Sequence, residues 1–292
     1  YVYKGECLPS IYAVVYDRLL LQESNFKGEQ LYGEIKSKNM KNNLKALGLS
    51  IITLIMFSCN DSDDVAKNPE SCLPANLQNG VIAFYPFSNG SLNDFSGNNY
   101  NLSNTTSASS GSDRAGNTNC AFHFNAANGD FLKYTNPTFV NDFQTLPFSI
   151  SLWYKNETST PGNYELLIGR DDNPHCPDTY GQWSVGLYDN RKPVFGINEY
   201  SLWWNISSSV ETSEWRHLVI TCTGTDLKLY LNGVLTSETA STGCSTNNPT
   251  INSGDLFLGK EFTGLLDDVI IYNRVLAQSE ITELNSLTPC CQ

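Results

Sequence analysis

The segment that decides the fold is "LKLYLNG", residues 227–233. Leucine occupies every second position, while Lys228, Tyr230 and Asn232 fill the positions between. In an extended strand this alternation makes one face apolar and leaves the other polar or aromatic. Asn232 is followed by Gly233, and Asn-Gly is the strongest short signal for a two-residue hairpin turn. The segment therefore predicts an antiparallel strand, buried on one face, that turns back on itself.

Similar runs recur from residue 80 to near the C-terminus. They are short, rich in aromatic and β-branched residues, and separated by Gly, Asn, Asp and Pro: "GVIAFYPF", "CAFHFN", "DFLKYT", "FSISLWYK", "YELLIGR", "QWSVGLYD", "KPVFGIN", "WRHLVITCTG", "LKLYLNGVLTSET", "LFLGKEF" and "LLDDVIIYNRVL". One segment, residues 278–287, has helical spacing, with Ile281 and Leu284 on one stripe. The pattern predicts an all-β fold of two packed antiparallel sheets with one terminal helix.

Six phrases of this sequence carry a family resemblance. They are "FYPFSNGSLNDFSGNNYNL", "AFHFNAANGDFLKY", "FSISLWYK", "WRHLVITCTGTDLKLYLNGVL", "LFLGK" and "FTGLLDDVIIYNRVLAQSEI". Their order resembles that of the concanavalin A-like, laminin G-type (LamG-like) jelly rolls of bacterial surface proteins. The resemblance implies a two-sheet antiparallel jelly-roll sandwich over residues 79–292, with one short C-terminal helix. Two positions depart from the family pattern: Cys222 replaces a usual aromatic residue, and Ala277 replaces a usual helix-capping serine.

Residues 40–58 have the layout of a secretory signal peptide. Met40 is followed by two lysines, an apolar run and Ser58, directly before Cys59. The apolar run is too short, and too closely followed by acidic residues, to favour a transmembrane span. The segment resembles a bacterial lipoprotein signal, although Met56 stands where such signals usually carry leucine. The resemblance implies a lipidated Cys59 and an anchor at the cell surface on the outer membrane. An ordinary buried helix is the alternative.

This interpretation divides the N-terminal region into two further parts. Residues 1–39 lie upstream of the better start at Met40, and we expect a leader that is not native to the protein. A small N-terminal domain is the alternative, but about 39 residues rarely bury enough surface to fold alone. Residues 59–78 form a polar tether, and their acidic tract "NDSDD" resembles the surface-export tag of lipoproteins in Bacteroidota.

The charge of the chain excludes one class of partner. Thirty acidic residues face 18 basic ones, which gives a net charge of −12. Nucleic-acid binding depends on Lys and Arg that neutralise phosphates, so nucleic acid is not expected. We expect a polysaccharide or a surface glycoprotein as partner, and membrane contact only through the lipid anchor.

Nine cysteines suggest an oxidising environment. Without Cys7 in the leader and the lipidated Cys59, an odd number is left, so at least one thiol is free or pairs between chains. Domain termini often lie close together, so we expect a disulfide between Cys72 and either Cys290 or Cys291. A second candidate pair joins Cys176 and Cys244, in two polar segments. A zinc site is the competing interpretation, but the sequence has no CxxC motif.

A possible structural calcium site lies in "LNDFSGNNYNL", residues 92–102. Oxygen-bearing side chains alternate around Gly97, and calcium prefers oxygen ligands. The predicted ligands are Asp94, Ser96 and Asn98. The family resemblance adds Asp267 or Asp268 as a further ligand. The alternative is a plain turn in which Asp94 bonds its own backbone.

The candidate ligand-binding residues are aromatic and acidic. Trp203 and Trp204 are neighbours and would face opposite sides of a strand, so one of the two could be exposed. With Tyr188 and Tyr200, an exposed tryptophan would suit stacking on a sugar ring. Asp171 and Asp172 lie in "RDDNPHCPDTYGQW", a predicted loop between two strands, where binding residues are often placed. A solvated loop held by a disulfide at Cys176 is the alternative.

Catalytic patterns are not found. Glycanases of this fold need paired carboxylates, often as Glu-x-Asp-x-x-Glu on one strand, and no such run occurs. Glu165 stands alone, and Asp267 and Asp268 are adjacent, so they are expected on opposite faces of a strand. The sequence also has no GxSxG nucleophile motif. We therefore expect a non-catalytic surface module that binds carbohydrate. The alternatives are a protein-binding adhesin, a structural subunit, and a hydrolase or lyase of the same fold.

Overall fold

A computed structural model describes most of the chain after residue 71. The described residues are 72–143, 145–157, 164–171, 174–176, 179–180, 183–188, 191–197, 200–203, 213–224, 226–238, 241–242 and 252–291. All of them belong to one compact unit, Lys67–Gln292. The predicted leader and signal peptide lie outside the described residues, as does the predicted tether up to residue 71. The leader, the signal peptide and the tether up to residue 71 stay predictions, whereas residues 72–78 belong to the folded domain, where Leu73 and Leu77 are buried.

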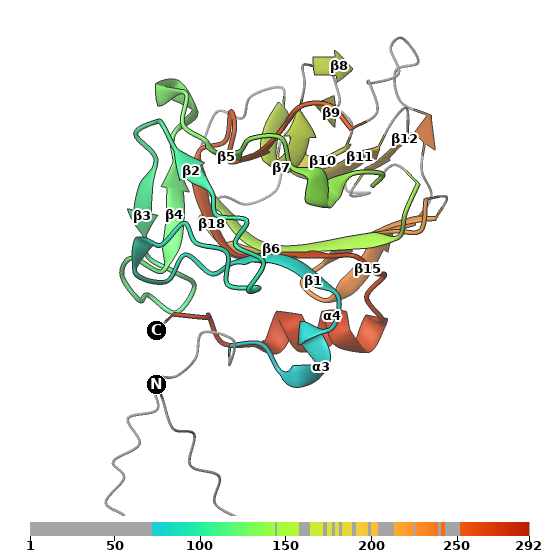
Figure 1. The fold of residues 1–292 in the computed structure, drawn as a ribbon, viewed down its shortest axis with the longest axis horizontal. Helices are drawn as coiled ribbons and strands as arrows, with labels where there is room; N and C mark the ends of the chain where they lie inside the picture. The colour runs from blue at the N-terminus through green and yellow to red at the C-terminus, as the bar shows by residue number, and fades with distance from the viewer. Residues whose placement is uncertain are drawn as a thin grey trace, which may run out of the picture. The chain divides into compact units, whose positions relative to one another are not determined.

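Most strands belong to two antiparallel sheets, which form two layers (Figure 1). The first sheet has the order β15-β14-β13-β6-β18-β4-β3, and β1 also pairs with β18. Its strands are β1 (Val81–Tyr85), β3 (Ser109–Gly111), β4 (Ala121–Phe124), β6 (Phe148–Asn156), β13 (Trp215–Cys222), β14 (Leu227–Leu231), β15 (Val234–Ser237) and β18 (Gly264–Tyr272). The segment "LKLYLNG" forms β14 and its turn into β15, so this hairpin prediction is confirmed.

The second sheet has the order β16-β12-β11-β10-β7-β17-β5-β2. Its strands are β2 (Ser103–Asn104), β5 (Leu132–Tyr134), β7 (Tyr164–Asp171), β10 (Trp183–Tyr188), β11 (Lys192–Ile197), β12 (Tyr200–Trp203), β16 (Ser241–Thr242) and β17 (Asp255–Leu258). A separate pair, β8 (Pro174–Cys176) and β9 (Thr179–Tyr180), lies within the predicted loop of residues 170–183. That segment is therefore a short hairpin and not only a loop.

The core lies between the two sheets, and alternation along each strand supplies it. Ile150 and Leu152 of β6 are buried there, and so are Val185 and Leu187 of β10. Burial of a large aliphatic side chain stabilises the fold by about 1.5–3 kcal/mol, so these residues dominate its stability. The two-sheet antiparallel sandwich predicted from the sequence is confirmed.

Helices cover the face of the first sheet that points away from the second (Figure 1). Helix α4 (Gln278–Ser286) buries Ile281 and Leu284 against Ile270 and Tyr272 of β18, and the short α3 (Ala75–Gln78) adds Leu77 to the same cluster. Three single-turn 3₁₀ helices, η3 (Ser88–Gly90), η4 (Ala126–Asn128) and η5 (Thr138–Val140), lie in connections. No helix among the described residues is long and apolar enough to cross a membrane.

The start of α4 lacks a side-chain cap at Ala277. Glu280 compensates in part, because its carboxylate accepts a hydrogen bond from the Ala277 backbone N–H at 2.8 Å. Arg274 holds the same carboxylate through two further bonds of 2.7 and 2.8 Å. The helix therefore begins where the sequence predicts, despite the missing serine.

Strand β18 is interrupted by a bulge at Asp267 and Asp268. Its pairing with β6 shifts register between Asp267 and Ile270, and Asp268 has a left-handed φ of 44°. On the other edge, β4 pairs with the half before the bulge and β1 pairs with the half after it. An extra residue in one strand re-aims the side chains around it. The two aspartates therefore do not obey the simple alternation of a strand.

Candidate functional site

The outer face of the second sheet, which points away from the first sheet, carries a row of aromatic and small residues. Phe257 alternates with the core residues Leu256 and Leu258, so it lies on this outer face. Its register partners are Lys133 on β5 and Gly169 on β7. The row continues through Ser184 on β10. Gly169 and Ser184 are buried, so the partly open part of this face lies toward β5, where Phe257 and Lys133 are half-buried.

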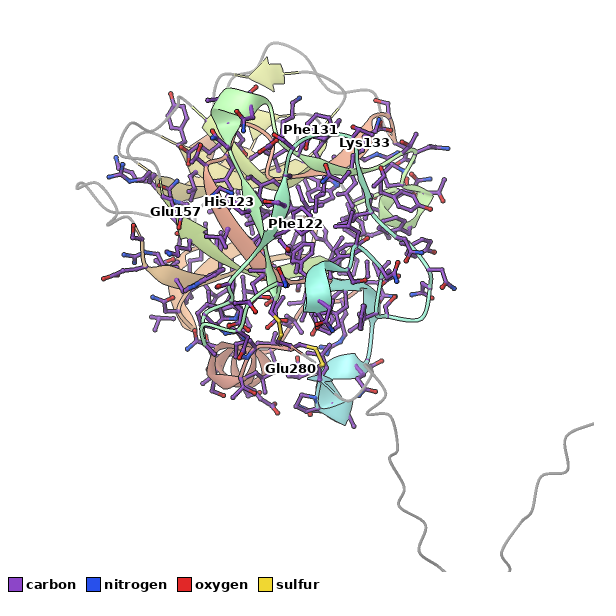
Figure 2. The ribbon with its side chains drawn as sticks, turned by 90° about the vertical axis from the view of Figure 1, so that its left-hand side faces the viewer. Phe122, His123, Phe131, Lys133, Glu157 and Glu280 are labelled. Atoms are coloured by element: carbon purple, nitrogen blue, oxygen red, sulfur yellow. A yellow bond between two sulfur atoms is a disulfide. The ribbon has the colours of Figure 1, made fainter. Side chains whose placement is uncertain are left out.

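An aromatic pair lies at the β5 end of this face. The rings of Phe131 and Phe257 meet edge to face, with centroids 5.3 Å apart, and both side chains are half-buried. The ammonium group of Lys260 lies 5.1 Å from the centroid of Phe257. Lys133 forms an ion pair of 3.4 Å with Asp255. Figure 2 shows Phe131 and Lys133 close together. We call these five residues the Phe257 platform.

Next to the Phe257 platform, Tyr164 of β7 fills the middle of this face. Its hydroxyl lies 2.7 Å from Ser184 Oγ, and its ring lies so close to Gly186 that a Cβ there would come within 2.6 Å of it. Tyr164, Leu166 and Val194 form a buried cluster that Tyr188 and Phe257 extend. Among the described residues of this face, the partly exposed aromatic side chains are therefore Phe131 and Phe257 at one end and Tyr188 at the other, with the buried cluster between them.

The described ligand-binding candidates lie on this same sheet. Asp171 ends β7 and pairs in register with Asp255, while Tyr188 ends β10 opposite Tyr164. On β12, Tyr200 pairs with Ile197 and Trp203 pairs with Val194. For Asp171, Tyr200 and Trp203 only the backbone is described. The side chain of Tyr188 is half-buried. Trp204 and Asp172 lie outside the described residues. The sequence did not indicate Phe131 or Phe257, although both lie in predicted strand segments.

The predicted calcium segment forms a tight turn around Asp94. The carboxylate of this residue accepts hydrogen bonds from the backbone N–H groups of Phe84 (2.9 Å), Ser96 (2.9 Å) and Tyr100 (3.0 Å). Ser96 Oγ lies 2.8 Å from the same carboxylate, and the Asn98 amide donates to the Ile82 carbonyl at 2.8 Å. Asp94 thus bonds backbone as the alternative interpretation expects. Calcium binding stays a prediction.

Asp267 and Asp268 lie together on one side of the bulge, so the expectation of opposite faces is wrong. Nη1 of Arg114 is 2.8 Å from an oxygen of each carboxylate, and all three side chains are largely buried. Burial raises the pKa of the Asp267 carboxyl well above its usual range, and the charge of Asp268 raises it further. Burial also raises the pKa of Asp268, although Arg114 opposes this effect. Both predicted metal ligands are therefore already neutralised in part by an arginine.

A stack of side chains continues from Arg114 across the first sheet. The Arg114 guanidinium lies 4.4 Å from the centroid of the Trp153 ring, and Trp153 stacks on His217 with centroids 5.0 Å apart. His217 Nε2 is 2.9 Å from Ser151 Oγ. Burial lowers the pKa of His217 to about 3, and the charge of Arg114 contributes. This serine and histidine resemble a nucleophile and base, but both are at most 2% exposed, so no substrate reaches them.

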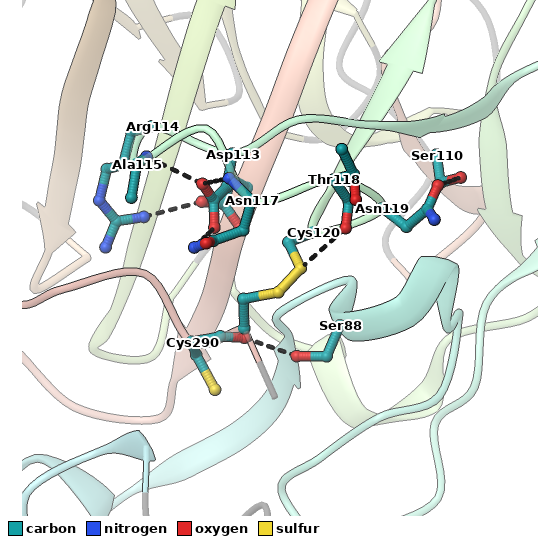
Figure 3. The surroundings of a disulfide bond; sticks show 12 residues. Ser88, Ser110, Asp113, Arg114, Ala115, Asn117, Thr118, Asn119, Cys120 and Cys290 are labelled. Carbon is teal, nitrogen blue, oxygen red and sulfur yellow. Dashed lines mark hydrogen bonds and ion pairs between the residues drawn. A yellow bond between two sulfur atoms is a disulfide. The ribbon is translucent and has the colours of Figure 1, made fainter.

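The C-terminal strap, residues 287–291, is fixed by two disulfides, and Figure 3 shows the surroundings of the one at Cys120. One joins Cys72 to Cys290 with a Cα–Cα distance of 5.4 Å, which confirms the predicted link between the ends of the domain. The other joins Cys120 to Cys291, a pairing that the sequence did not indicate. Cys222 is a buried free thiol. The proposed pair Cys176–Cys244 cannot be placed, because the side chain of Cys176 and all of Cys244 lie outside what is described.

Asp113 lies close to the second disulfide, and its carboxylate and the two sulfurs all lie within 4.8 Å of one another. The sulfurs are bonded to each other, and the Asp113 carboxylate accepts hydrogen bonds from Ala115 and Asn117. The two sulfurs are therefore not available as thiolate ligands for zinc here.

The comparisons with known proteins agree with this architecture. Residues 127–282 match the model of the concanavalin A-like lectin/glucanases superfamily (Laminin_G_3). The match covers more than half of the chain, so the protein belongs to this superfamily. No curated protein sequence matches the chain.

Several solved structures share the fold. Domain 4 of AbnA, an extracellular arabinanase from Geobacillus stearothermophilus in complex with arabinotriose, matches with a TM-score of 0.52 and 21% identity over 70% of this chain and 98% of that one. The binding domain of Paraclostridial Mosquitocidal Protein 1 matches with a TM-score of 0.55 and 20% identity over 72% and 52%. A structure of botulinum neurotoxin type C, whose cell entry depends on interaction with two ganglioside molecules, matches with a TM-score of 0.54 and 19% identity over 73% and 53%. The chain spans about half the length of the two toxin structures.

Proposed function

We propose that this domain is a non-catalytic binding module for carbohydrate and that its ligand lies on the outer face of the second sheet. The observation that carries the proposal is the half-buried Phe131–Phe257 pair next to charged side chains on that face. Sugar rings present apolar faces and polar edges, so they suit an aromatic surface flanked by hydrogen-bonding groups.

The structural neighbours support the choice of ligand class. The AbnA domain was solved with arabinotriose, and the type C neurotoxin interacts with gangliosides. Both ligands are carbohydrates or contain them. Proteins of the same fold can bind different ligands, so the proposed ligand class depends on the residues of the second sheet. A polysaccharide or a surface glycoprotein fits the proposal.

The site extends along the second sheet in this proposal. The Phe257 platform provides one stacking surface, and Tyr188 with Trp203 or Trp204 provides another. Asp171 supplies a polar group at the end of β7, while Asp172 and Tyr200 stay predictions from the sequence.

A glycan array tests this proposal. The protein should be retained by at least one polysaccharide or oligosaccharide, and Phe257→Ala or Trp203→Ala should weaken retention. Val234→Ser is the matched control, because Val234 is 63% exposed on β15 of the first sheet. A blank array would point to a protein-binding adhesin, and release of reducing ends would point to an enzyme.

We also propose that the module is held on the outer membrane through lipid on Cys59. The signal-like layout of residues 40–58 and the polar composition of residues 59–71 support this. Intact-mass measurement of the cellular protein is the test. It should find a chain that begins at Cys59 with the added mass of lipid, and residues retained before Cys59 would contradict the proposal.

A further inference from the structure

A small cavity lies between the outer face of the first sheet and the C-terminal strap. Its polar wall includes His217 on β13 and Asp268 on β18, with Arg114 beside them. Its cover includes Thr288 and Cys290 of the strap. The cavity measures about 10 Å³, which is about the space that one water molecule needs.

Two buried polar atoms of the lining residues have no partner among the described residues. One is Nδ1 of His217, a residue that is 1% exposed. The other is Oδ1 of Asp268, whose Oδ2 already accepts bonds from Arg114 at 2.8 Å and from the Cys290 backbone N–H at 3.3 Å. Buried polar groups are nearly always hydrogen-bonded, to protein or to ordered water.

We infer that this cavity is a hydration site in which one water molecule bridges His217 Nδ1 and Asp268 Oδ1. The protons balance in either tautomer of the neutral imidazole. If Nε2–H donates to Ser151, the water donates one hydrogen to Nδ1 and the other to Asp268. If Ser151 donates to Nε2, then Nδ1–H donates to the water, which still donates to Asp268.

The chemistry of the wall favours water over a cation. Arg114 already places a positive charge on both aspartates, and a second cation would lie close to it. Water both donates and accepts, so it satisfies both atoms in a space of this size.

The bridge gives the strap a link that the disulfides do not provide. A continuous chain of hydrogen bonds would run from Ser151 on β6 through His217 and the water to Asp268, which already holds the Cys290 N–H. Central strands of the sheet and the C-terminal strap would therefore move together.

A high-resolution crystal structure of the protein is the direct test. It should show a water oxygen at about 2.7–3.2 Å from both His217 Nδ1 and Asp268 Oδ1. A direct bond between these two atoms, a metal ion, or an empty cavity would each overturn the inference. The wild-type density is decisive even if a variant does not fold.

Water magnetic relaxation dispersion tests the inference in solution by counting long-lived internal waters. His217→Phe removes the nitrogen and should reduce the count by one. Tyr85→Phe is the matched control, because Tyr85 is also buried, its hydroxyl already donates to the Tyr100 carbonyl at 2.7 Å, and it does not line this cavity. An unchanged count in His217→Phe, or an equal loss in Tyr85→Phe, would contradict the assignment.

Discussion

Arg114 joins the neighbouring carboxylates of Asp267 and Asp268, and one of its nitrogens lies 2.8 Å from an oxygen of each. The bulge in β18 makes this possible, because it turns two adjacent side chains toward the same cation. The same guanidinium donates to the Leu287 carbonyl at 3.1 Å and stacks on Trp153. Arg114 therefore couples the sheet, the bulge and the C-terminal strap.

Replacing Arg114 should destabilise the fold strongly. Arg114→Met leaves two buried carboxylates without their cation, and loss of one partner of a buried ion pair costs about 3–5 kcal/mol. Chemical denaturation measures the change in the free energy of unfolding. Lys228→Gln is the control, because Lys228 is exposed and its pair with Glu238 at 3.9 Å should contribute at most about 1 kcal/mol. Equal small losses in both variants would show that Arg114 is not needed for stability.

His217 should make the fold less stable in acid. Its pKa falls to about 3 in the folded state, whereas an unfolded histidine titrates near 6.5. Below pH 6.5, His217 binds a proton in the unfolded chain but stays neutral in the folded chain until the pH nears 3. Stability therefore falls as the pH drops from 6.5 toward 3, with a slope of up to about 1.4 kcal/mol per pH unit.

The variant His217→Gln isolates this effect. The raised pKa values of Asp267 and Asp268 act in the opposite direction, so the difference between wild type and variant is the informative quantity. The variant should have a lower free energy of unfolding than wild type at pH 7, and this difference in free energy should be smaller at pH 4. A gap that stays constant between these pH values would mean that His217 does not titrate as described.

The two described disulfides predict a particular peptide map. Digestion without reductant should release one peptide pair that joins Cys72 to Cys290 and another that joins Cys120 to Cys291. Because Cys290 and Cys291 are adjacent, the digest needs a cleavage between them or fragmentation of the linked peptides. Cys222 should react with a thiol reagent only after unfolding, because it is buried. A swapped pairing would contradict the described arrangement of the strap.

The calcium prediction has a simple thermal test. A cation that binds the folded state raises the melting temperature, so a structural calcium at Asp94 should give a higher value in calcium than in chelator. Asp94→Ala should abolish that difference. It should also lower stability in both buffers, because Asp94 bonds the backbone of Phe84 and Tyr100. A melting temperature that chelator leaves unchanged would discard calcium and keep the turn.

Local pattern was enough to predict the main elements of this fold. The alternation in residues 227–231 and the Asn-Gly turn gave β14 and β15, and helical spacing gave α4. Strands of two or three residues, such as β2 and β16, are too short to show a period. The bulge at Asp268 was not predicted, because no sequence pattern indicates that an aspartate within a strand adopts a left-handed φ.

The candidate site was predictable only in part. Single aromatic and acidic residues on the second sheet could be found from strand patterns, and several of them lie there. The pairing of Phe131 with Phe257 depends on β17 lying beside β5, although these strands are far apart in sequence. The partner of Asp267 and Asp268 was missed for the same reason, because Arg114 comes from the connection between β3 and β4.

The measurement that tests the central claim most directly is the affinity of wild type, Phe257→Ala and Val234→Ser for the best glycan on the array, by titration calorimetry. Loss of one stacking aromatic should weaken binding about tenfold or more, which corresponds to about 1.4 kcal/mol. Val234→Ser should bind like wild type, and both variants should remain folded. Equal affinity of all three proteins would contradict a glycan site at the Phe257 platform.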